Sequence, residues 1–477
     1  MKRIHPAIVL MLIVFLTAAM GASADTPRRP GELTLPDLAF EIPEASETRL
    51  SNGIRVLLFE NHDLPLINLS AYVTMGERYL SPERRPACRV LGRIWDEGGI
   101  GDFTPEEVDS KVASLGMSLT AGVGHARAYV QASMVREDLA DGALLWGDLL
   151  LRPRFSEERL ERAKAHLLKD VQGINDDPGR LAETWFLRLL SGENSPEGHV
   201  QTREEIEAVH RKDILSLYDL FVRPERAVVG VSGDITMTEA VALLESLLGD
   251  WRSEGEANLL EPYVWERVPR PGVYLLPGDY EQCHLRMGRG LPELTDTAAD
   301  YPEVKLLDFG VGYLRIFYRT RSEGLSYGTS TRLTAGADRG KIWAFGSTRP
   351  SGIVSLVAAV REEVVELSSR PLDNGEVSTA RTFVLGTQIR RMETARNVVG
   401  VRLDEIVLGQ PAGYTANLIA GLQSATVESV AAAATRHMSF GDTPVVLVVG
   451  TPEGGVEALE ALGLGPVTVL EPVEFGK

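Results

Sequence analysis

The sequence Arg89-Val90-Leu91-Gly92-Arg93-Ile94-Trp95-Asp96-Glu97-Gly98-Gly99 predicts a helix together with its end. Pro86 stands shortly before it, in the first-turn position that proline favours, and the two closing glycines are a typical helix stop. Arg89 and Arg93 are four residues apart, so a helix places both on one face. Gly92 lies directly before the second arginine. The stretch therefore predicts a helix that carries two cations one turn apart.

The segments around this helix predict strands and helices in a fixed order. Asn52-Gly53 is a turn signal, and we expect residues 54–59 to form a strand paired with residues 67–74. Downstream, the pattern predicts a helix from Thr104 to about Gly116, a hairpin of residues 117–121 and 126–134, helices at about 139–151 and 156–174, and a strand at 227–231.

The same order recurs in the second half of the chain, which indicates a duplication. Residues 206–209 and 213–214 match residues 422–425 and 429–430, and the strand and glycine of 228–233 match 445–450, all at nearly the same offset along the chain. The predicted division is a signal peptide (1–24), a linker (25–47), an N-terminal domain (48–254), a proline-rich linker (255–271) and a C-terminal domain (272–472).

Composition excludes some classes of function. The 477 residues carry a formal net charge of −18, which argues against a nucleic-acid partner because phosphate binding needs a positive surface. Cys88 and Cys283 fall in different halves within apolar segments, so we expect two buried free thiols rather than a disulfide framework.

The first residues predict export. A basic start is followed by an apolar run over about residues 7–20 and by Ala22-Ser23-Ala24, the parts of a secretory signal cut after Ala24. The run is shorter than the ~20 residues needed to span a bilayer. The expected location is the periplasm or the exterior, without a stable membrane span. An uncleaved signal anchor is the alternative.

The arginine helix has the spacing of an H-x-x-E-H zinc helix, in which two histidines hold the metal and the glutamate activates water. Here both histidine positions are arginine, and the glutamate position is Gly92. Arginine is cationic at usable pH and offers no lone pair to a metal. Gly92 has no side chain to accept a proton from water.

The chain resembles the insulinase/pitrilysin (inverzincin) family of zinc metallopeptidases, in particular its processing-peptidase-like branch, over about residues 48–470. The resemblance rests on the order and spacing of several segments, with Glu97-Gly98-Gly99 setting the register of the helix: 50–56, 76–78, 205–214, 223–226, 229–234 and 323–328.

The resemblance implies an α+β fold of two homologous insulinase-type domains in tandem, each a mostly antiparallel sheet packed with helices on one side. The two zinc-binding histidines of the family fall on Arg89 and Arg93 and its catalytic base on Gly92. Its third ligand, a glutamate at a fixed spacing beyond the second histidine, falls on Asp170. We therefore expect no zinc and no catalytic residue, and a degenerate site at these four positions.

The resemblance also implies a substrate-binding arginine and tyrosine in the second half. The tyrosine matches Tyr327, and Arg319 and Arg321 are both candidates for the arginine, because the spacing to Gly324 is off by one residue. In this branch a full chamber takes two chains, often one catalytic and one degenerate.

We expect Arg89 or Arg93 to form an ion pair with Asp170 where the family holds its metal, a bidentate pair in a partly buried cleft. The alternative is local pairing on a solvated face, for instance of Arg93 with Glu97.

The leading hypothesis is a non-catalytic subunit that binds peptide and supports an active zinc-peptidase partner in a heterodimer. The alternatives are a scaffold of the same fold without a peptidase partner, and a zinc endopeptidase with non-standard ligands such as His166 and Asp170, which lie four apart on one helix.

Overall fold

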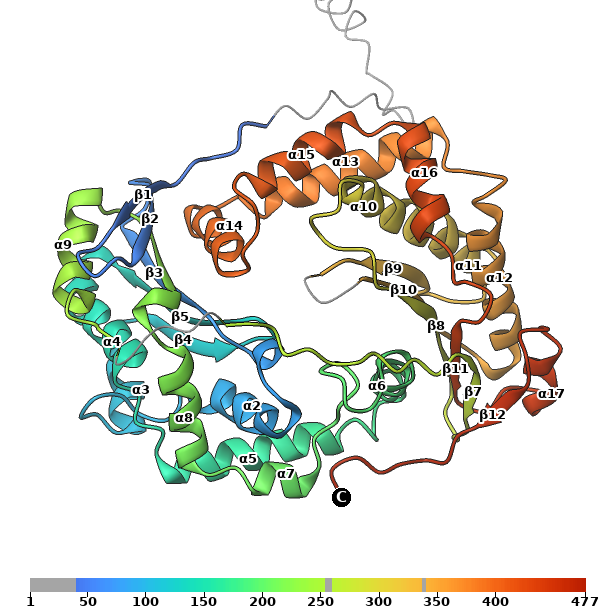
Figure 1. Ribbon diagram of the computed structural model, residues 1–477, viewed down its shortest axis with the longest axis horizontal. Helices are drawn as coiled ribbons and strands as arrows, with labels where there is room; N and C mark the ends of the chain where they lie inside the picture. The colour runs from blue at the N-terminus through green and yellow to red at the C-terminus, as the bar shows by residue number, and fades with distance from the viewer. Residues whose placement is uncertain (1–39, 254–259, 337–339) are drawn as a thin grey trace, which may run out of the picture. The chain divides into compact units, whose positions relative to one another are not determined.

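The computed structural model describes residues 40–253, 260–336 and 340–477 (Figure 1). The predicted signal peptide (1–24), most of the first linker and the start of the second lie outside the described residues. Within the described residues, none of the helices is long and apolar enough to cross a membrane.

The first half contains one six-stranded sheet with the strand order β1-β2-β6-β3-β5-β4. Its strands are β1 (Ser46–Arg49), β2 (Arg55–Glu60), β3 (Leu66–Thr74), β4 (Ser118–Val123), β5 (Arg127–Val135) and β6 (Ala227–Gly233). Its helices are α2 (Arg85–Ile94), α3 (Pro105–Ser114), α4 (Leu139–Leu151), α5 (Glu157–Gln172), α6 (Pro178–Ser191), α7 (Arg203–Glu207), α8 (Arg211–Phe221) and α9 (Met237–Leu248).

The second half repeats the plan with the order β12-β7-β11-β8-β10-β9. Its strands are β7 (Gly272–Leu276), β8 (Cys283–Leu291), β9 (Ser330–Thr334), β10 (Gly340–Thr348), β11 (Val445–Val449) and β12 (Val467–Val469). Its helices are α10 (Tyr301–Phe309), the π-helix η6 (Gly310–Phe317), α11 (Tyr318–Ser322), α12 (Ile353–Glu366), α13 (Asn374–Arg390), α14 (Ala395–Val407), α15 (Tyr414–Ser424), α16 (Val427–His437) and α17 (Gly455–Glu460).

The two sheets match strand for strand except at one edge, which confirms the predicted α+β fold of two similar, mostly antiparallel sheets. Gly233 is the last residue of β6 and Gly450 directly follows β11, the matching strand, with φ of 118° and 117°. The edge differs because β1 pairs antiparallel with β2, whereas β12 pairs parallel with β7. The second half therefore fills its edge with a strand from near the end of the chain.

One predicted strand pairing is wrong. Residues 54–59 and 67–74 do form β2 and β3, but β6 lies between them, parallel to β2 and antiparallel to β3. The Asn52-Gly53 turn instead joins β2 to β1, which the sequence had placed partly in the linker. Local patterns identify the strands, but they carry no information about a strand that returns from far downstream.

Each sheet has a second face that is covered by a helix from the other half. In the first sheet, Leu57, Tyr72 and Val228 point away from the main core and pack on Val399 and Leu403 of α14. These strand residues alternate with core-facing neighbours, as a strand covered on both faces requires.

Gly230 of β6 allows this close approach. A Cβ at Gly230 would lie 2.3 Å from Cγ1 of Val399 and 2.8 Å from Cδ1 of Leu403, both of which belong to the second half. Any larger residue would push α14 away from the sheet.

The reverse exchange covers the second sheet. Helix α6 of the first half packs on β8 and β11, where Leu181, Trp185 and Phe186 share one buried cluster with Val445 and Leu447 (Figure 1). The starts of α6 and α14, at 178 and 395, are separated by the offset of the duplication, so they are the same element of the duplicated unit. Because each half supplies a helix to the other, residues 41–477 cluster as one unit.

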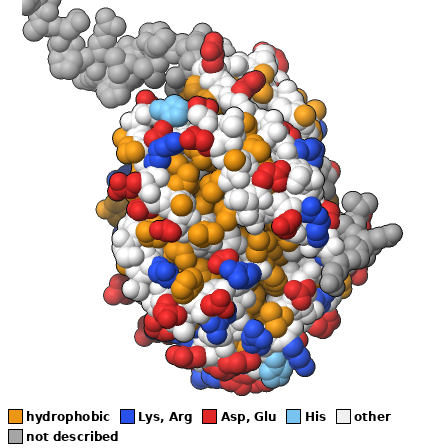
Figure 2. Space-filling model, turned by 90° about the vertical axis from the view of Figure 1, so that its left-hand side faces the viewer, with side chains coloured by type: hydrophobic (Ala, Val, Ile, Leu, Met, Phe, Trp, Pro, Cys, Tyr) orange, Lys and Arg blue, Asp and Glu red, His pale blue; other side chains and the backbone are white. Residues whose placement is uncertain are grey.

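The two cysteines are free and buried, as predicted. Burial raises the pKa of the Cys283 thiol to about 11, which keeps it protonated at neutral pH. On the face drawn in Figure 2, acidic and basic side chains are interspersed around an apolar centre. That face offers no continuous basic surface for phosphate.

We predict that Gly230→Ala lowers the free energy of unfolding by about 1–3 kcal/mol, because the new methyl group overpacks the contact with α14. Val399→Ala removes the nearest opposing atom, so the double variant should lose less than the sum of the two single variants, by about 0.5–3 kcal/mol. Urea unfolding of all four proteins measures this coupling. Strict additivity would contradict the packing of α14 on β6.

Candidate functional site

Helix α2 is held in place by its apolar face. Val90, Leu91 and Ile94 have no exposed surface, and the indole of Trp95, also fully buried, donates a hydrogen bond of 3.1 Å to the carbonyl oxygen of Leu149. This burial fixes the rotation of the helix, so the residues on its other face have a defined direction. That face carries the arginines.

Arg89 is bound by Glu77, a residue that the sequence analysis did not select. Both nitrogens of one edge of the guanidinium donate to the carboxylate, Nε to Oε1 and Nη2 to Oε2, the latter at 3.2 Å. The Glu77 side chain is only 14% exposed. A two-point pair of this kind fixes the orientation of the arginine as well as its charge. Arg89 is thereby held toward Glu77.

Arg93 reaches across to helix α5 and forms an ion pair with Asp170. Of the two arginines that we considered for this pair, Arg93 is the one that makes it. The pair joins one nitrogen to one oxygen, and the side chains are 48% and 47% exposed. The expectation of a bidentate pair is therefore wrong, and because both side chains are about half exposed, solvent limits the contribution of the pair to about 1 kcal/mol or less.

Gly92 lies against strand β4 of the sheet. A Cβ at this position would meet the backbone nitrogen of Val123 at 3.3 Å, which is a tight contact. A glutamate here would require strand and helix to separate by a few tenths of an ångström. The packing of α2 on β4 is thus matched to the glycine.

A third arginine completes the cationic face. Arg85 precedes Arg89 by four residues, is fully buried, and donates from Nη1 to the carbonyl oxygen of Asn194 at 3.2 Å. Its guanidinium also lies 5.7 Å from the ring centroid of Tyr263, in the linker between the halves. Burial lowers the pKa of Arg85. The i, i+4, i+8 spacing was visible in the sequence and would have identified Arg85 as part of this face.

A pocket of about 360 Å³ opens beside these residues. It is lined by charged side chains of both signs and by apolar ones, among them Arg89, Asp170, Arg180, Glu183 and Leu187. The lining thus combines both signs of charge with apolar surface.

Glu197 lines this pocket and also a second one of about 490 Å³. Burial opposes the ionisation of Glu197, but the ammonium group of Lys341, which bonds to it, together with Ser191 and Arg267 outweighs that effect and lowers the pKa of the carboxyl group. Ser191 donates a further hydrogen bond of 3.0 Å to Glu197. This acid stays ionised between the two pockets.

The residues at the zinc-helix positions do not fit a zinc ion. Arg89 and Arg93 have no lone pair to donate and would repel a dication, and the carboxylate of Asp170 is already paired with Arg93. Nor do the described residues contain a cluster of three or more histidine, cysteine, aspartate or glutamate side chains that could hold a metal elsewhere. His166 is exposed on α5.

In the second half, Tyr327 and Arg321 lie together. The guanidinium of Arg321 is 5.3 Å from the ring centroid of Tyr327 and 5.6 Å from that of Phe317. Tyr327 is 85% exposed. Of the two candidate arginines, Arg321 is the one that accompanies the tyrosine.

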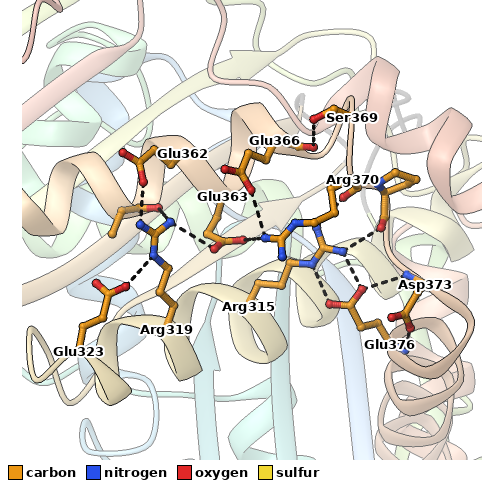
Figure 3. A network of polar contacts seen from close by, with 12 residues as sticks. Arg315, Arg319, Glu323, Glu362, Glu363, Glu366, Ser369, Arg370, Asp373 and Glu376 are labelled. Carbon is orange, nitrogen blue, oxygen red and sulfur yellow. Dashed lines mark hydrogen bonds and ion pairs between the residues drawn. The ribbon is translucent and has the colours of Figure 1, made fainter.

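Arg319 is occupied by acids. Its guanidinium bonds to Glu323 at 3.0 Å, to Glu362 at 2.6 Å and to Glu363 at 3.2 Å, within a network that also includes Arg315 (Figure 3). The bond from Glu362, together with the contribution of Glu323, raises the pKa of Arg319 despite partial burial. Arg319 therefore joins α11 to α12 and is not available to hold a ligand.

Comparison with known proteins agrees with this fold. Residues 208–384 match the family model described as the Peptidase M16 inactive domain. This match does not include residues 89–93, so it says nothing about the altered helix.

Several bacterial relatives align over most of the chain. "Uncharacterized zinc protease YmxG" of Bacillus subtilis is 20% identical over 75% of this chain and 87% of its own. "Non-peptidase homolog YmxG" of Helicobacter pylori is 24% identical over 83% of this chain and 91% of its own. A shorter match, 22% identical, joins 45% of this chain to 44% of mitochondrial-processing peptidase subunit beta of Mus musculus.

The fold has solved counterparts. A structure described as a peptidase M16 inactive domain from Pseudomonas fluorescens has a TM-score of 0.72 at 20% identity and covers 86% of this chain and 98% of its own. The class of protein is therefore that of the insulinase-like (M16) fold. The family resemblance inferred from the sequence is confirmed.

We predict that Asp170→Asn changes the free energy of unfolding by less than about 1 kcal/mol, because the pair with Arg93 is half exposed. Glu77→Gln should cost more, since it leaves Arg89 beside a partly buried, uncharged partner. Urea denaturation compares the two isosteric variants. An equal or larger loss for Asp170→Asn would contradict the exposure of this pair.

We predict that restoring the ligand residues creates a zinc site. A fourfold variant should bind one zinc ion per chain, because α2 and α5 already hold residues 93 and 170 in contact. It combines Arg89→His, Gly92→Glu, Arg93→His and Asp170→Glu. Metal analysis after dialysis is the measurement, with glutamine in place of both histidines as the control. A folded variant that retains no zinc would show that the helices are not spaced for a metal.

Proposed function

We propose that this chain is a non-catalytic insulinase-like protein that binds extended peptide and supports an active zinc-peptidase partner. The observation that carries the proposal is the ion pair between Arg93 and Asp170, which occupies the place that the family resemblance gives to the metal. Without a metal and without a general base at position 92, the helix has no group to activate water.

Peptide binding is supported by a pocket in the first half and by an exposed arginine–tyrosine pair in the second. The pocket beside Arg89 and Asp170 is present, and its lining offers both charges together with apolar side chains. Arg321 lies beside the exposed Tyr327, in keeping with what the resemblance implies for residues that hold a substrate backbone.

The need for a partner follows from the groups that this chain has and lacks. A chain that keeps binding groups and lacks the catalytic ones needs a second chain to cleave what it binds. The match to a subunit of the mitochondrial-processing peptidase supports a two-chain assembly. The expected location remains the periplasm or the exterior, from the predicted signal peptide cut after Ala24.

A peptidase with non-standard ligands has less support. His166 and Asp170 share helix α5, but His166 is exposed and Asp170 is engaged by Arg93. Two residues on one helix also leave a zinc ion short of the three protein ligands that a catalytic site uses.

We predict that the isolated chain binds labelled unfolded peptide in a fluorescence anisotropy titration and does not cleave it, with or without added zinc.

Purification from the native source should recover a second chain with an intact H-x-x-E-H helix. Recombining the two should give hydrolysis that a chelator abolishes.

A variant of the partner in which the glutamate of that helix is replaced by glutamine is the control, since it should bind the chain and leave peptide intact. Chelator-sensitive hydrolysis by the isolated chain would overturn the proposal. Failure of the isolated chain to bind any peptide would overturn the peptide-binding part of it.

A further inference from the structure

A row of aromatic rings runs along the second half, and we name it the aromatic strip: Phe309, Tyr313, Phe317, Tyr318 and Phe383. Phe309 stacks on Phe383 at 4.0 Å between ring centroids and on Tyr313 at 5.1 Å, and Tyr313 stacks on Phe317 at 4.9 Å. Tyr318 packs edge-on against Tyr313 and Phe317.

The π-helix η6 carries Tyr313 and Phe317, the middle of this row. Residues 310–317 hydrogen-bond in the wider π-helical turn, which is rare and is frequently found at functional sites. Glycines occupy the opposite face: a Cβ at Gly310 would lie 2.4 Å from Leu372, and one at Gly312 would lie 2.6 Å from Ser330 Oγ. Small residues let the helix pack closely on its buried side, so the rings are presented outward.

The strip is open to solvent and has neutral neighbours on α13. Tyr313, Tyr318 and Phe383 are 40%, 52% and 55% exposed. The residues one helical turn from Phe383 are uncharged: Thr379, Ala380, Gly386 and Thr387. The exposed rings therefore lie in an apolar face on this side of α13, and such a face is often functional in soluble proteins.

The duplication gives the strip a counterpart in the first half. Helices α10 and α13 correspond to α2 and α5, and the offset of the duplication places Phe309 at the position of Arg93 and Phe383 at that of His166. The two halves therefore present opposite chemistry at equivalent places: charged groups beside a pocket in the first, stacked rings in the second.

The size of the strip indicates its occupant. Three half-exposed aromatic side chains offer about 200–400 Å². A stable subunit interface buries about 800 Å² on each partner, so the strip is too small to hold a second protein by itself. The row of rings has the length of about four residues of an extended chain. A peptide segment fits this size.

The strip also leads to Arg321, to which the proposed function gives the substrate backbone. The guanidinium of Arg321 lies over Phe317, the last ring of the stacked row, and over Tyr327. A chain held along the rings would continue onto the Arg321–Tyr327 pair.

We propose that the aromatic strip binds the apolar side chains of an extended polypeptide, with Arg321 and Tyr327 receiving the adjoining backbone. This inference rests on the proposed peptide-binding function and names the class of segment that is bound, one rich in aromatic or large aliphatic residues.

The experiment uses two labelled peptides of equal length, one in which phenylalanine alternates with serine and one with glutamine in place of each phenylalanine. Fluorescence anisotropy measures their binding to three proteins. These are the unaltered full chain, the strip variant, which combines Tyr318→Thr with Phe383→Thr, and the control variant Leu144→Thr. Leu144 is a matched control, since it is 54% exposed on α4 of the other half. A photoreactive benzophenone side chain in the first peptide maps the site by crosslinking.

We expect the phenylalanine peptide to bind the full chain and the Leu144→Thr control equally, and the strip variant at least about tenfold more weakly. Crosslinks should fall within residues 309–318 or at Phe383. The glutamine peptide should bind all three proteins weakly.

Equal binding of the phenylalanine peptide to the full chain and the strip variant would overturn the strip and leave the proposed function standing. Binding of neither peptide would overturn both. Sedimentation gives a further test. If the full chain self-associates and the strip variant does not, the strip is an interface between copies, and the proposal that it binds peptide is overturned.

Discussion

The contact of α14 with β6 at Gly230 is the constraint on which the rest of the structure depends. It lets a helix of the second half lie within van der Waals distance of the first sheet, and α6 makes the reciprocal contact with the second sheet. A sheet with two apolar faces needs cover on both. The exchange supplies that cover and joins two similar halves into one unit, in which both halves line the pocket of about 490 Å³.

Within this shared frame the two halves have diverged at equivalent places. The first presents Arg89, Arg93 and Asp170 beside a pocket, and the second presents stacked rings on α10 and α13. The packing that holds these side chains is apolar and lies on the other face of each helix. Chemistry at the exposed face can therefore change without loss of the fold, which is why an altered zinc helix persists in an intact structure.

Much of the fold could be predicted from the sequence, because helix and strand signals are local. The helix that carries Arg89 and Arg93, the helix at 139–151, the hairpin of β4 and β5 and the duplication match the structure. The insertion of β6 between β2 and β3 and the exchange of α6 and α14 could not be predicted, since they depend on contacts far apart in the chain. The unbroken apolar run of residues 56–59 was the available hint that β2 is covered on both faces.

The candidate site was predictable in part through the family resemblance. The resemblance placed Asp170 opposite the arginine helix, and the pair with Arg93 is present. The partner of Arg89 was not predictable, because Glu77 lies in a 3₁₀ turn whose direction is set by tertiary packing. The choice between Arg319 and Arg321 required the positions of Glu362 and Tyr327, which come from other elements.

Zinc titration of the metal-free chain by isothermal calorimetry tests the central claim most directly. If an ion pair has replaced the metal, the titration will show no stoichiometric binding, and the chain will not hydrolyse peptide at any zinc concentration. Binding of one zinc ion per chain, together with hydrolysis that a chelator abolishes, would contradict the account.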